Sequence, residues 1–583
     1  MPFFFTFAIM IEKRWKIKET PQTNEEINIV KQLSKAINVN ETLATILWQR
    51  GITDFEAAKD FFRPSLNHLH DPFLMADMHI AVERLEKAFA NKERIMIYGD
   101  YDVDGTTAVA LVYGFLSSFY DNLEYYNPDR YIEGYGVSKQ GIDWAAEQGV
   151  SLIISLDCGI KSADKVQYAQ DTFKIDFIIC DHHEPDDNLP KAVAVLDPKR
   201  KDCLYPFKEL TGNGVGFKML QAYCIKNNLP LEKLYEYLDL AVVSIGSDIV
   251  PIVGENRVMA HFGLQKLNKN PRIGLKALKE IAGFNQEMTI ENVVFVLGPR
   301  INAAGRIKHA KAAVQLLLEN DYDKALSFAE EIQKHNVERR EHDSRITEEA
   351  LSMIREDDWL LNTAKSTVLY RQDWHKGVIG IVASRCIEKF YRPTIILTES
   401  KGKAAGSARS VAGFNLYDAI ESCSHLLEQF GGHTHAAGMT LPIENVVAFR
   451  EAFDKIVNER ISAEQLIPKI DIDLEIELGD ITTKFYNIIK QLAPFGPENM
   501  QPIFSTKQVT LARKPQILKE KHLKIELLDE NTGETLTALG FGMTEDFYEP
   551  LMKNKYFDIV YQIEENNFRG NTSLQLFLKD IKF

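Results

Sequence analysis

The chain has 583 residues, of which 45% are apolar and 26% charged, a composition typical of a soluble globular protein with several domains. It contains no low-complexity tract, which argues against a disordered or fibrous protein. The net charge of −15 argues only weakly against a nucleic-acid partner, because a global sum hides local basic patches and a metal centre needs many carboxylates.

The six cysteines are scattered and lack the spacing of a zinc site, so we expect reduced thiols and a cytoplasmic location. The first ten residues, MPFFFTFAIM, are apolar but too short to span a bilayer, and they lack the features of a cleaved signal peptide. A start at Met10 fits the sequence better. We find no membrane segment elsewhere and expect none.

Between about Glu93 and Asp248, short apolar runs each end at an acidic residue. The runs are RIMIYGD at Asp100, SLIISLD at Asp157, FIICD at Asp181, AVAVLD at Asp197 and LAVVSIGSD at Asp248. Segments long enough for helices, such as 106–120 and 162–171, separate most of them. This alternation predicts an α/β domain whose strands are buried on both faces of a parallel sheet. Ligands bind at the carboxyl ends of such strands, so these acidic residues should meet at one edge.

The strongest local motif is GDYDVDGTT, in which Asp100, Asp102 and Asp104 alternate directly after an apolar run. In an extended segment, a period of two would place all three side chains on one face. Three carboxylates together are unfavourable unless a cation binds them. An isolated motif of this kind would be a solvated acidic turn, but the preceding apolar run places these residues at the edge of the sheet.

A second motif, Asp181-His182-His183, follows another apolar run. Adjacent histidines in an extended segment should point in opposite directions, so that one is a ligand and the other is not. Oxygen ligands with one or two imidazoles and no thiolate favour Mn²⁺ or Mg²⁺ over structural zinc. With Asp157 and Asp248 the ligands exceed the needs of one ion, and two ions roughly 3.5–4 Å apart would account for them.

The second half of the chain has a different pattern. Residues 322–359 are polar and lack Pro and Gly, which predicts one or two long exposed helices. A second α/β unit is predicted over 366–442, with strands TVLYR and TIILTE and a helix over 379–390. Alternating strands from Ile470 onward predict a small barrel or sandwich, such as an OB-fold. We expect an N-terminal extension (1–75), a first α/β domain (76–320), a helical connector (321–360), a second α/β domain (361–462) and an OB-like domain (463–583).

Three motifs rich in small residues could bind phosphate. GPRINAAGRI (298–307) contains two arginines, GSARS (406–410) offers two hydroxyls and an arginine, and GGHTHAAG (431–438) carries His433 in a Gly-rich turn. Each motif alone is weak evidence, and GSARS by itself is equally well read as an ordinary polar loop.

In order along the chain, GDYDVDGTT, SLDCGI, CDHH and SIGSDIVP resemble the motifs of the DHH phosphoesterase superfamily. The resemblance implies two Mn²⁺ or Mg²⁺ ions, bridged by Asp157, that hydrolyse phosphoanhydride or phosphodiester bonds. The implied metal ligands are Asp102, Asp104, Asp157, His182 and Asp248. Many members have a His near the start of the first motif, where this chain has Tyr98, which makes Asp100 a candidate substitute ligand. His183 would bind the phosphate, orient the nucleophile or act as a general acid.

GPRINAAGR, HKGVIGIVASR, GSARS and GGHTHAAG resemble the DHH-associated domain of bacterial exonucleases that degrade single-stranded DNA from its 5′ end, and LAPFGPENMQPIF resembles the start of their OB-fold. The likeness extends from about Glu93 to the C-terminus. It implies a role in DNA repair and recombination, a monomer, and a helicase and a single-strand-binding protein as partners. The implied substrate-binding residues are Arg300, Asn302, Arg306, His375, Ser407, Arg409, Ser410, Gly432 and His433.

Two other classes of function compete with this interpretation. Phosphodiesterases of cyclic dinucleotides or short oligonucleotides share the resemblance but lack the long C-terminal domain, and a pyrophosphatase is disfavoured for the same reason. A non-catalytic binding module, as in relatives that have lost their metal ligands, is disfavoured because every expected carboxylate is present here.

Overall fold

The computed structural model describes residues 12–130, 132–307, 311–530, 532–568 and 570–583, so the expectation about the first ten residues falls outside it. By compactness the chain divides into two units. One comprises residues up to Phe55, Arg339–Gln491 and Pro502–Phe583, and the other comprises Glu56–Glu338 and Leu492–Gln501. The five-domain division expected from the sequence stays a prediction.

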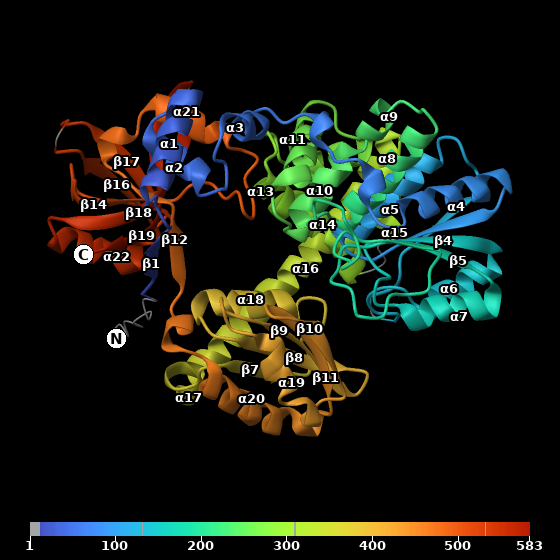
Figure 1. The fold of residues 1–583 in the computed structure, drawn as a ribbon. Coiled ribbons are helices and arrows are strands. Elements are labelled where there is room, and N and C mark those ends of the chain that lie inside the picture. The colour runs from blue at the N-terminus through green and yellow to red at the C-terminus, as the bar shows by residue number, and fades with distance from the viewer. Residues whose placement is uncertain (1–11, 131, 308–310, 531, 569) are drawn as a thin grey trace. The chain divides into compact units, whose positions relative to one another are not determined.

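The Glu56–Glu338 unit is built on a five-stranded parallel sheet with the strand order β3-β2-β4-β5-β6 (Figure 1). The strands are β2 (Arg94–Gly99), β3 (Leu123–Tyr126), β4 (Val150–Leu156), β5 (Asp176–Cys180) and β6 (Ala194–Leu196). Four of them confirm the predicted runs that precede Asp100, Asp157, Asp181 and Asp197. The edge strand β3 is not predicted, because only one of its four residues is buried and it forms no apolar run.

Helices enclose this sheet on both faces, and alternate residues of each strand enter two separate cores. Along β2, Ile95 and Ile97 pack into one core, whereas Met96 and Tyr98 pack into the other. The strands contact the helices α4 (Met78–Ala90), α5 (Val103–Leu116), α6 (Lys139–Glu147), α7 (Ala163–Phe173) and α8 (Gly212–Lys226). The helices α9 (Glu232–Tyr235), α10 (Leu238–Asp248), α11 (Gly254–Lys269), α12 (Ile273–Ile281), α13 (Ile290–Asn292), α14 (Gly298–Ile307) and α15 (Lys311–Leu318) follow in the same unit. Burial on both faces explains why the strands are continuous apolar runs.

The predicted strand that ends at Asp248 is wrong, because LAVVSIGSD forms the helix α10. Nine consecutive residues of this helix, Leu238–Gly246, are buried, so the helix is buried on every side and most of its residues are apolar. Periodicity cannot distinguish such a helix from a buried strand. Asp248 therefore approaches the sheet edge from the end of a helix that packs against α5 and α11.

A fully buried ion pair joins two helices of this unit. The Lys218 Nζ on α8 lies 3.0 Å from Glu255 Oε1 on α11, and neither side chain is exposed. The Tyr205 hydroxyl donates to the other carboxylate oxygen at 2.6 Å, and Lys218 also donates to the His70 carbonyl at 2.6 Å. The pair depends on both charges, because a single buried charge loses its compensation.

Lys218→Met should therefore lower the free energy of unfolding by about 3–5 kcal/mol, because the buried Glu255 carboxylate loses the cation that compensates its charge. Lys218→Met combined with Glu255→Gln should be less destabilised than the single variant. Lys226→Met removes a half-exposed lysine from the end of the same helix and should change the free energy by less than about 1 kcal/mol. Urea unfolding measures all three, and equal losses in both lysine variants would contradict this account.

A 35-residue helix, α16 (Tyr322–Glu356), confirms the predicted long helix, and the boundary between the two units falls within it. The short α17 (Asp358–Asn362) follows. This helix still buries part of its surface, since Ala329, Ile332 and Ile346 are each 0% exposed.

The second α/β domain lies within the unit that contains Arg339–Gln491 and is built on a mixed five-stranded sheet in the order β10-β11-β9-β8-β7. Its strands are β7 (Thr367–Arg371), β8 (Thr394–Ser400), β9 (Lys403–Arg409), β10 (Gln429–His433) and β11 (Ala436–Leu441), with helices α18 (Ile379–Lys389), α19 (Leu416–Glu421) and α20 (Val446–Arg460). The predicted strands TVLYR and TIILTE and the predicted helix are confirmed. Only β7 and β8 are parallel.

The C-terminal domain is a seven-stranded sheet in the order β13-β14-β18-β19-β17-β16-β15, and an additional β14–β16 pairing curls it toward a barrel. Its main elements are β13 (Leu474–Glu475), α21 (Thr483–Gln491), β14 (Phe504–Leu511), β15 (Gln516–Leu518), β16 (His522–Leu528), β17 (Thr535–Gly540), α22 (Thr544–Lys553), β18 (Phe557–Phe568) and β19 (Asn571–Lys582). This confirms the predicted OB-like domain.

The N-terminal segment packs against this barrel. Strand β1 (Arg14–Ile17) pairs in parallel with β12 (Lys469–Ile472), and the Trp15 indole donates to Asp580 Oδ2 at 2.7 Å. The helices α1 (Asn24–Ile37), α2 (Glu41–Trp48) and α3 (Phe55–Phe62) follow. All six cysteines are buried free thiols. Within the described ranges, no helix is both long and apolar enough to cross a membrane.

Candidate metal centre

The three aspartates of GDYDVDGTT do not lie in an extended segment, and that expectation is wrong. Asp100 follows β2, but α5 begins at Val103, so Asp102 caps this helix and accepts a hydrogen bond from the Gly105 amide at 3.0 Å. Asp104 lies in the first helical turn. Short polar side chains favour the cap position, which is why the helix begins inside the motif.

The Asp104 carboxylate is held by the beginning of another helix. It accepts hydrogen bonds from the amides of Gly212 and Asn213, at 2.6 and 2.9 Å, in the first turn of α8. The Ser244 hydroxyl of α10 donates to it at 2.7 Å. The positive end of the α8 dipole therefore stabilises a carboxylate that is only 2% exposed.

Asp157 lies at the centre of the site. It follows β4 with a φ of 59°, a left-handed conformation that aspartate tolerates better than most residues. A Cβ on Gly212 would lie 2.5 Å from the Asp157 Cβ, so only glycine allows α8 to approach this closely. Asp157 is 2% exposed, and among the described residues its Oδ2 atom has no hydrogen-bond partner.

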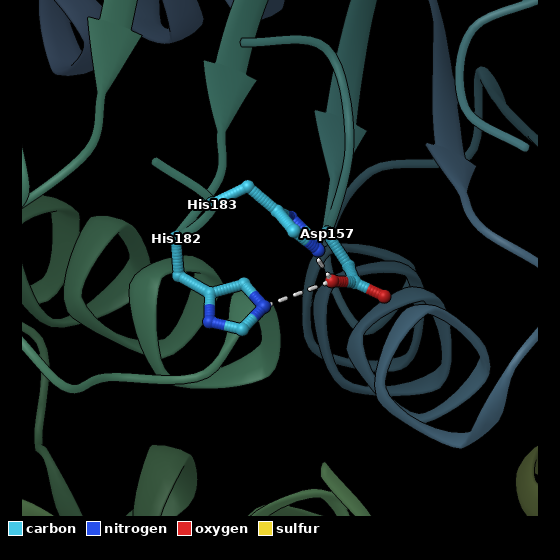
Figure 2. Close-up of side chains that lie close together, drawn as sticks. All are labelled: Asp157, His182 and His183. Carbon is cyan, nitrogen blue, oxygen red and sulfur yellow. Dashed lines mark hydrogen bonds and ion pairs between the residues drawn. The ribbon is translucent and has the colours of Figure 1, made fainter. Parts of the chain in front are cut away.

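Both histidines of the Asp181-His182-His183 motif point toward Asp157, so the expectation that they point in opposite directions is wrong (Figure 2). His182 Nε2 lies 3.2 Å from Asp157 Oδ1, and His183 Nδ1 lies 4.0 Å from the same oxygen. The motif lies beyond the end of β5 and does not alternate like a strand, which lets the two ring centroids approach to 4.5 Å.

Three overlapping groups of side chains are arranged to hold cations. Their members are Asp100, Asp102 and Asp157; Asp157, His182 and His183; and Asp104, His182 and Asp248. In each group the ligand atoms lie within 4.8 Å of one another. Asp157 and His182 each belong to two groups. Of these, Asp157 would be the residue that serves two neighbouring ions, because its carboxylate has two oxygens, whereas His182 would bind one ion through Nε2.

The pKa values of these carboxyl groups also indicate that the site holds cations. Burial, and then the charges of Asp102 and Asp104, raise the pKa of Asp157 well above its ordinary value. Burial and neighbouring carboxylates likewise raise the pKa values of Asp100 and Asp248. Among the described residues, Asp100 Oδ2 also lacks a hydrogen-bond partner. These oxygens, with two imidazoles and no thiolate among the groups, fit a hard divalent cation such as Mn²⁺ or Mg²⁺.

Two residues near His183 are absent from the predicted site residues, although the sequence places Asp181 among the acidic residues expected at the edge of the sheet. Asp181 accepts hydrogen bonds from the backbone amides of Ile160 and His182, at 2.9 and 2.8 Å, and from the His183 ring at 2.8 Å. Tyr135 places its hydroxyl 3.1 Å from His183 Nε2 and donates to the Asp157 carbonyl at 3.1 Å. The acidic residue at the end of β5 is a signal for Asp181, but the loop that carries Tyr135 offers none.

Asp181 sets the charge of His183. Burial opposes ionisation of this imidazole, but the hydrogen bond and charge of Asp181 raise the pKa of His183 to about 9. The same contacts lower the pKa of Asp181 below its ordinary value despite its burial. These contacts favour the protonated form of His183 when no metal ion is bound.

Tyr98, which stands where many DHH proteins have a histidine, lies in the core with 0% exposure. Its hydroxyl donates to the Gly136 carbonyl at 2.9 Å and accepts from the Ser138 amide at 3.1 Å. The Gly136 amide in turn donates to Asp100 Oδ1 at 3.1 Å. Tyr98 thus supports the loop that orients Asp100, and Asp100 is the residue that belongs to a cation-binding group.

The three predicted phosphate-binding residues of this unit lie on α14. Arg300 Nε donates to Gln333 Oε1 at 2.9 Å, and its Nη1 donates to the Val296 carbonyl at 2.6 Å. Asn302 is partly exposed, and the side chain of Arg306 lies outside the described part of the chain. None of these residues belongs to the three cation-binding groups, and their proposed contact with substrate remains a prediction.

In the second α/β domain, several of the predicted substrate-binding residues lie close together on the adjacent strands β9, β11 and β10. His433 pairs with Ala436 of β11, which pairs with Arg409 of β9. Arg409 Nη1 donates to Ser407 Oγ at 3.1 Å. A Cβ on Gly380, in the first turn of α18, would lie 2.8 Å from Ser407 Oγ, so this helix begins directly against the hydroxyl and the guanidinium.

The remaining predicted residues support the loops around this cluster. Gly432 has a φ of 148°, and a Cβ there would lie 2.3 Å from the Ala436 carbonyl oxygen. Ser410 donates to the Phe414 carbonyl at 2.9 Å, and the His375 ring accepts from the Gly377 amide at 3.1 Å.

The fold is that of the DHH family of proteins. The family model described as DHH family, N-terminal domain, matches residues 94–245, the DHHA1 domain matches 363–459, and the RecJ OB domain matches 472–580.

The chain is 37% identical over 571 residues to the single-stranded-DNA-specific exonuclease RecJ of Bacillus subtilis, an alignment that covers 97% of this chain and 70% of that protein. It is 33% identical to RecJ of Salmonella typhimurium over 86% of this chain and 89% of that protein. The chain belongs to the RecJ family. The crystal structure of RecJ in complex with Mn²⁺ from Thermus thermophilus superposes with a TM-score of 0.83 at 25% identity, covering 98% of this chain and 79% of that one.

Saturating Mn²⁺ should stabilise the protein, by about 2.7 kcal/mol at a hundred times its dissociation constant, because it binds only the folded state. Asp157→Asn should abolish most of this gain. In EDTA the same variant should be more stable than the parent, because one of several repelling carboxylates is removed.

Thermal unfolding with and without Mn²⁺ checks both statements. Asp164→Asn, the same substitution at an exposed position of α7, serves as the control and should resemble the parent. Equal stabilisation of all three proteins by Mn²⁺ would exclude this centre as the metal site.

Proposed function

We propose that the chain is a metal-dependent exonuclease that hydrolyses single-stranded DNA in the 5′→3′ direction, in DNA repair and recombination. The observation that carries this proposal is the buried set of carboxylates and imidazoles around Asp157, in a chain of the RecJ family. Relatives at 37% and 33% identity are named single-stranded-DNA-specific exonucleases.

The residues of the centre divide into ligands and supports. Two Mn²⁺ or Mg²⁺ ions would be held by Asp100, Asp102, Asp104, Asp157, His182 and Asp248. Divalent ions supply Lewis-acid activation of water and neutralise charge on the phosphate. The protein's own contribution is rigidity, because the α8 amides and Ser244 fix the Asp104 carboxylate before substrate binds.

His183 would act on the substrate itself. Its Nδ1 lies 2.8 Å from Asp181 Oδ1, which orients the ring. As an imidazolium it can donate a hydrogen bond to a non-bridging phosphate oxygen, or a proton to the leaving 3′-oxygen. Tyr135, 3.1 Å from the ring, limits its rotation.

The Ser407–Arg409–His433 cluster supports the assignment of polarity. A planar guanidinium beside a hydroxyl and the beginning of α18 forms a compact group of donors for a terminal phosphate. A pocket that accepts only the 5′ end of a chain would give the 5′→3′ direction.

One face of the barrel supports a polynucleotide substrate. Lys524, Leu539 and Phe577 form a row across β16, β17 and β19, on the side opposite the buried residues. Phe541, which is 52% exposed, stacks on Phe577 with ring centroids 4.7 Å apart. The Lys579 ammonium lies 5.1 Å from the Phe577 ring. Exposed aromatic rings among lysines suit single-stranded nucleic acid.

The alternative substrate class is a cyclic dinucleotide or a short oligonucleotide. The metal centre would serve either class equally, and the barrel favours the longer substrate. We further propose a cytoplasmic monomer that works with a helicase and a single-strand-binding protein, since these would supply and cover the strand that the enzyme degrades.

Oligonucleotides labelled at either end, single-stranded or duplex, test the reaction with Mn²⁺, Mg²⁺ or EDTA. We expect metal-dependent loss from the 5′ end of single strands only. Asp157→Asn should lower kcat by at least about a hundredfold, since even outer-shell changes at metal sites cost about 10–100-fold. Asp164→Asn should leave the rate unchanged.

Two outcomes would contradict the proposal. If long strands survive while dinucleotides or cyclic dinucleotides are cut, the metal centre stands and the substrate assignment is wrong. If no phosphodiester is hydrolysed, the chain is a binding module.

Phe541→Ala should raise KM for long single strands at least about fivefold, because base stacking on an aromatic ring contributes about 1–3 kcal/mol. KM for a dinucleotide should not change. Tyr556→Ala removes another exposed aromatic ring, which precedes β18 and is not part of the row across β16, β17 and β19, and is the control. Equal KM values for Phe541→Ala and the parent on long strands would argue against this surface.

A further inference from the structure

The segment Leu492–Gln501, here called the 492–501 loop, belongs to the unit of the metal centre, although the residues on both sides of it belong to the other unit. It connects α21 to β14 and contains most of the motif LAPFGPENMQPIF, which the sequence assigns to the OB-like domain. The contacts within its own unit show what this loop does.

A buried arginine anchors the beginning of the loop. Arg257 of α11 is 4% exposed, and its guanidinium donates to the carbonyls of Leu492 and Ala493, at 2.9 and 3.0 Å. It also donates to the Phe61 carbonyl at 3.0 Å and lies 3.7 Å from the Phe61 ring centroid. A guanidinium bound to several carbonyls at once holds the backbone in one orientation.

A buried asparagine gives the loop its shape. Asn499 is 1% exposed, and its Nδ2 donates to the carbonyls of Leu492 and Pro494, at 2.9 and 2.8 Å. The backbones of Gly496 and Asn499 exchange two hydrogen bonds, of 3.1 and 2.9 Å. These hydrogen bonds within the loop hold its backbone in one conformation.

The tip of the 492–501 loop packs against the turn that follows Asp248. The Ile252 amide donates to the Pro497 carbonyl at 2.8 Å. A Cβ on Gly496 would lie 2.4 Å from Ile252 Cγ1, so there is no room for any side chain at this position. Ile252 is itself 0% exposed.

This turn needs external support. Ile249 follows the metal-ligand candidate Asp248 directly and has a φ of 59°, a left-handed conformation that is strained for a β-branched residue. Ile249 is 63% exposed, so its own packing contributes little to holding that conformation. Two hydrogen bonds hold the turn. The Ile252 amide donates to the Pro497 carbonyl, and the Asn256 side-chain amide donates to the Pro251 carbonyl at 3.1 Å.

We propose that the 492–501 loop is a positioning element of the metal centre, which holds the turn 249–252 and thereby Asp248 in the geometry that binds the cation. The C-terminal segment would then contribute to metal affinity as well as to DNA binding. The inference rests on the proposed function, because it assumes that Asp248 is a metal ligand.

Binding of Mn²⁺ to the full chain, measured by titration calorimetry or by electron paramagnetic resonance, tests this directly. Gly496→Ala should raise the dissociation constant of Mn²⁺ about tenfold, the effect typical of residues that support metal ligands. In an Ile252→Ala background the same substitution should change it by less than about twofold, because the atom that it would meet is gone.

Two controls separate this role from others. Phe541→Ala on the barrel should weaken DNA binding without changing Mn²⁺ affinity. Thermal unfolding in EDTA verifies that each variant is folded. If Gly496→Ala does not fold, Arg257→Lys replaces it, because this variant keeps the charge but loses the multiple carbonyl contacts and should also raise the dissociation constant of Mn²⁺. An unchanged Mn²⁺ dissociation constant in a folded variant would overturn the inference. This holds even if the parent degrades no DNA, because the measurement uses metal alone.

Discussion

The structure of the Glu56–Glu338 unit depends on burying several carboxylates at one edge of its parallel sheet. Carboxylates so close together would repel one another and resist ionisation. The fold compensates part of this cost with hydrogen-bond donors, from the first turn of α8 to Asp104 and from the backbone around β5 to Asp181. Among the described residues, Asp100 and Asp157 each keep one buried oxygen without a donor. A divalent cation is what completes this arrangement.

The sequence predicts the sheet well, because strands buried on both faces are continuous apolar runs whose ends are visible at Asp100, Asp157 and Asp181. It fails at α10, since a helix buried on every side has the same composition as a buried strand. It also fails in detail at Asp102 and His183, where backbone geometry changes directly after a strand. Tyr135 cannot be predicted, because its proximity to His183 depends on a loop between β3 and α6 whose path no periodicity reveals.

The centre also depends on parts of the chain that are far away in sequence. Asp248 comes from the end of α10, and the turn after it contacts a loop near residue 496. Family likeness assigns that loop to the OB-like domain, whereas its hydrogen bonds go to α11 and to the turn that follows Asp248. If this loop positions Asp248 as we propose, a segment from the C-terminal part of the chain contributes to metal affinity through its contacts with the turn 249–252.

Anomalous diffraction from crystals of the full chain soaked in Mn²⁺ tests the central claim most directly, because it locates the ions without reference to activity. We expect two peaks roughly 3.5–4 Å apart, both within bonding distance of Asp157, with Asp248 and His182 around one of them. A chain with no ion at Asp157 under saturating Mn²⁺, or with its ions bound elsewhere, would contradict it.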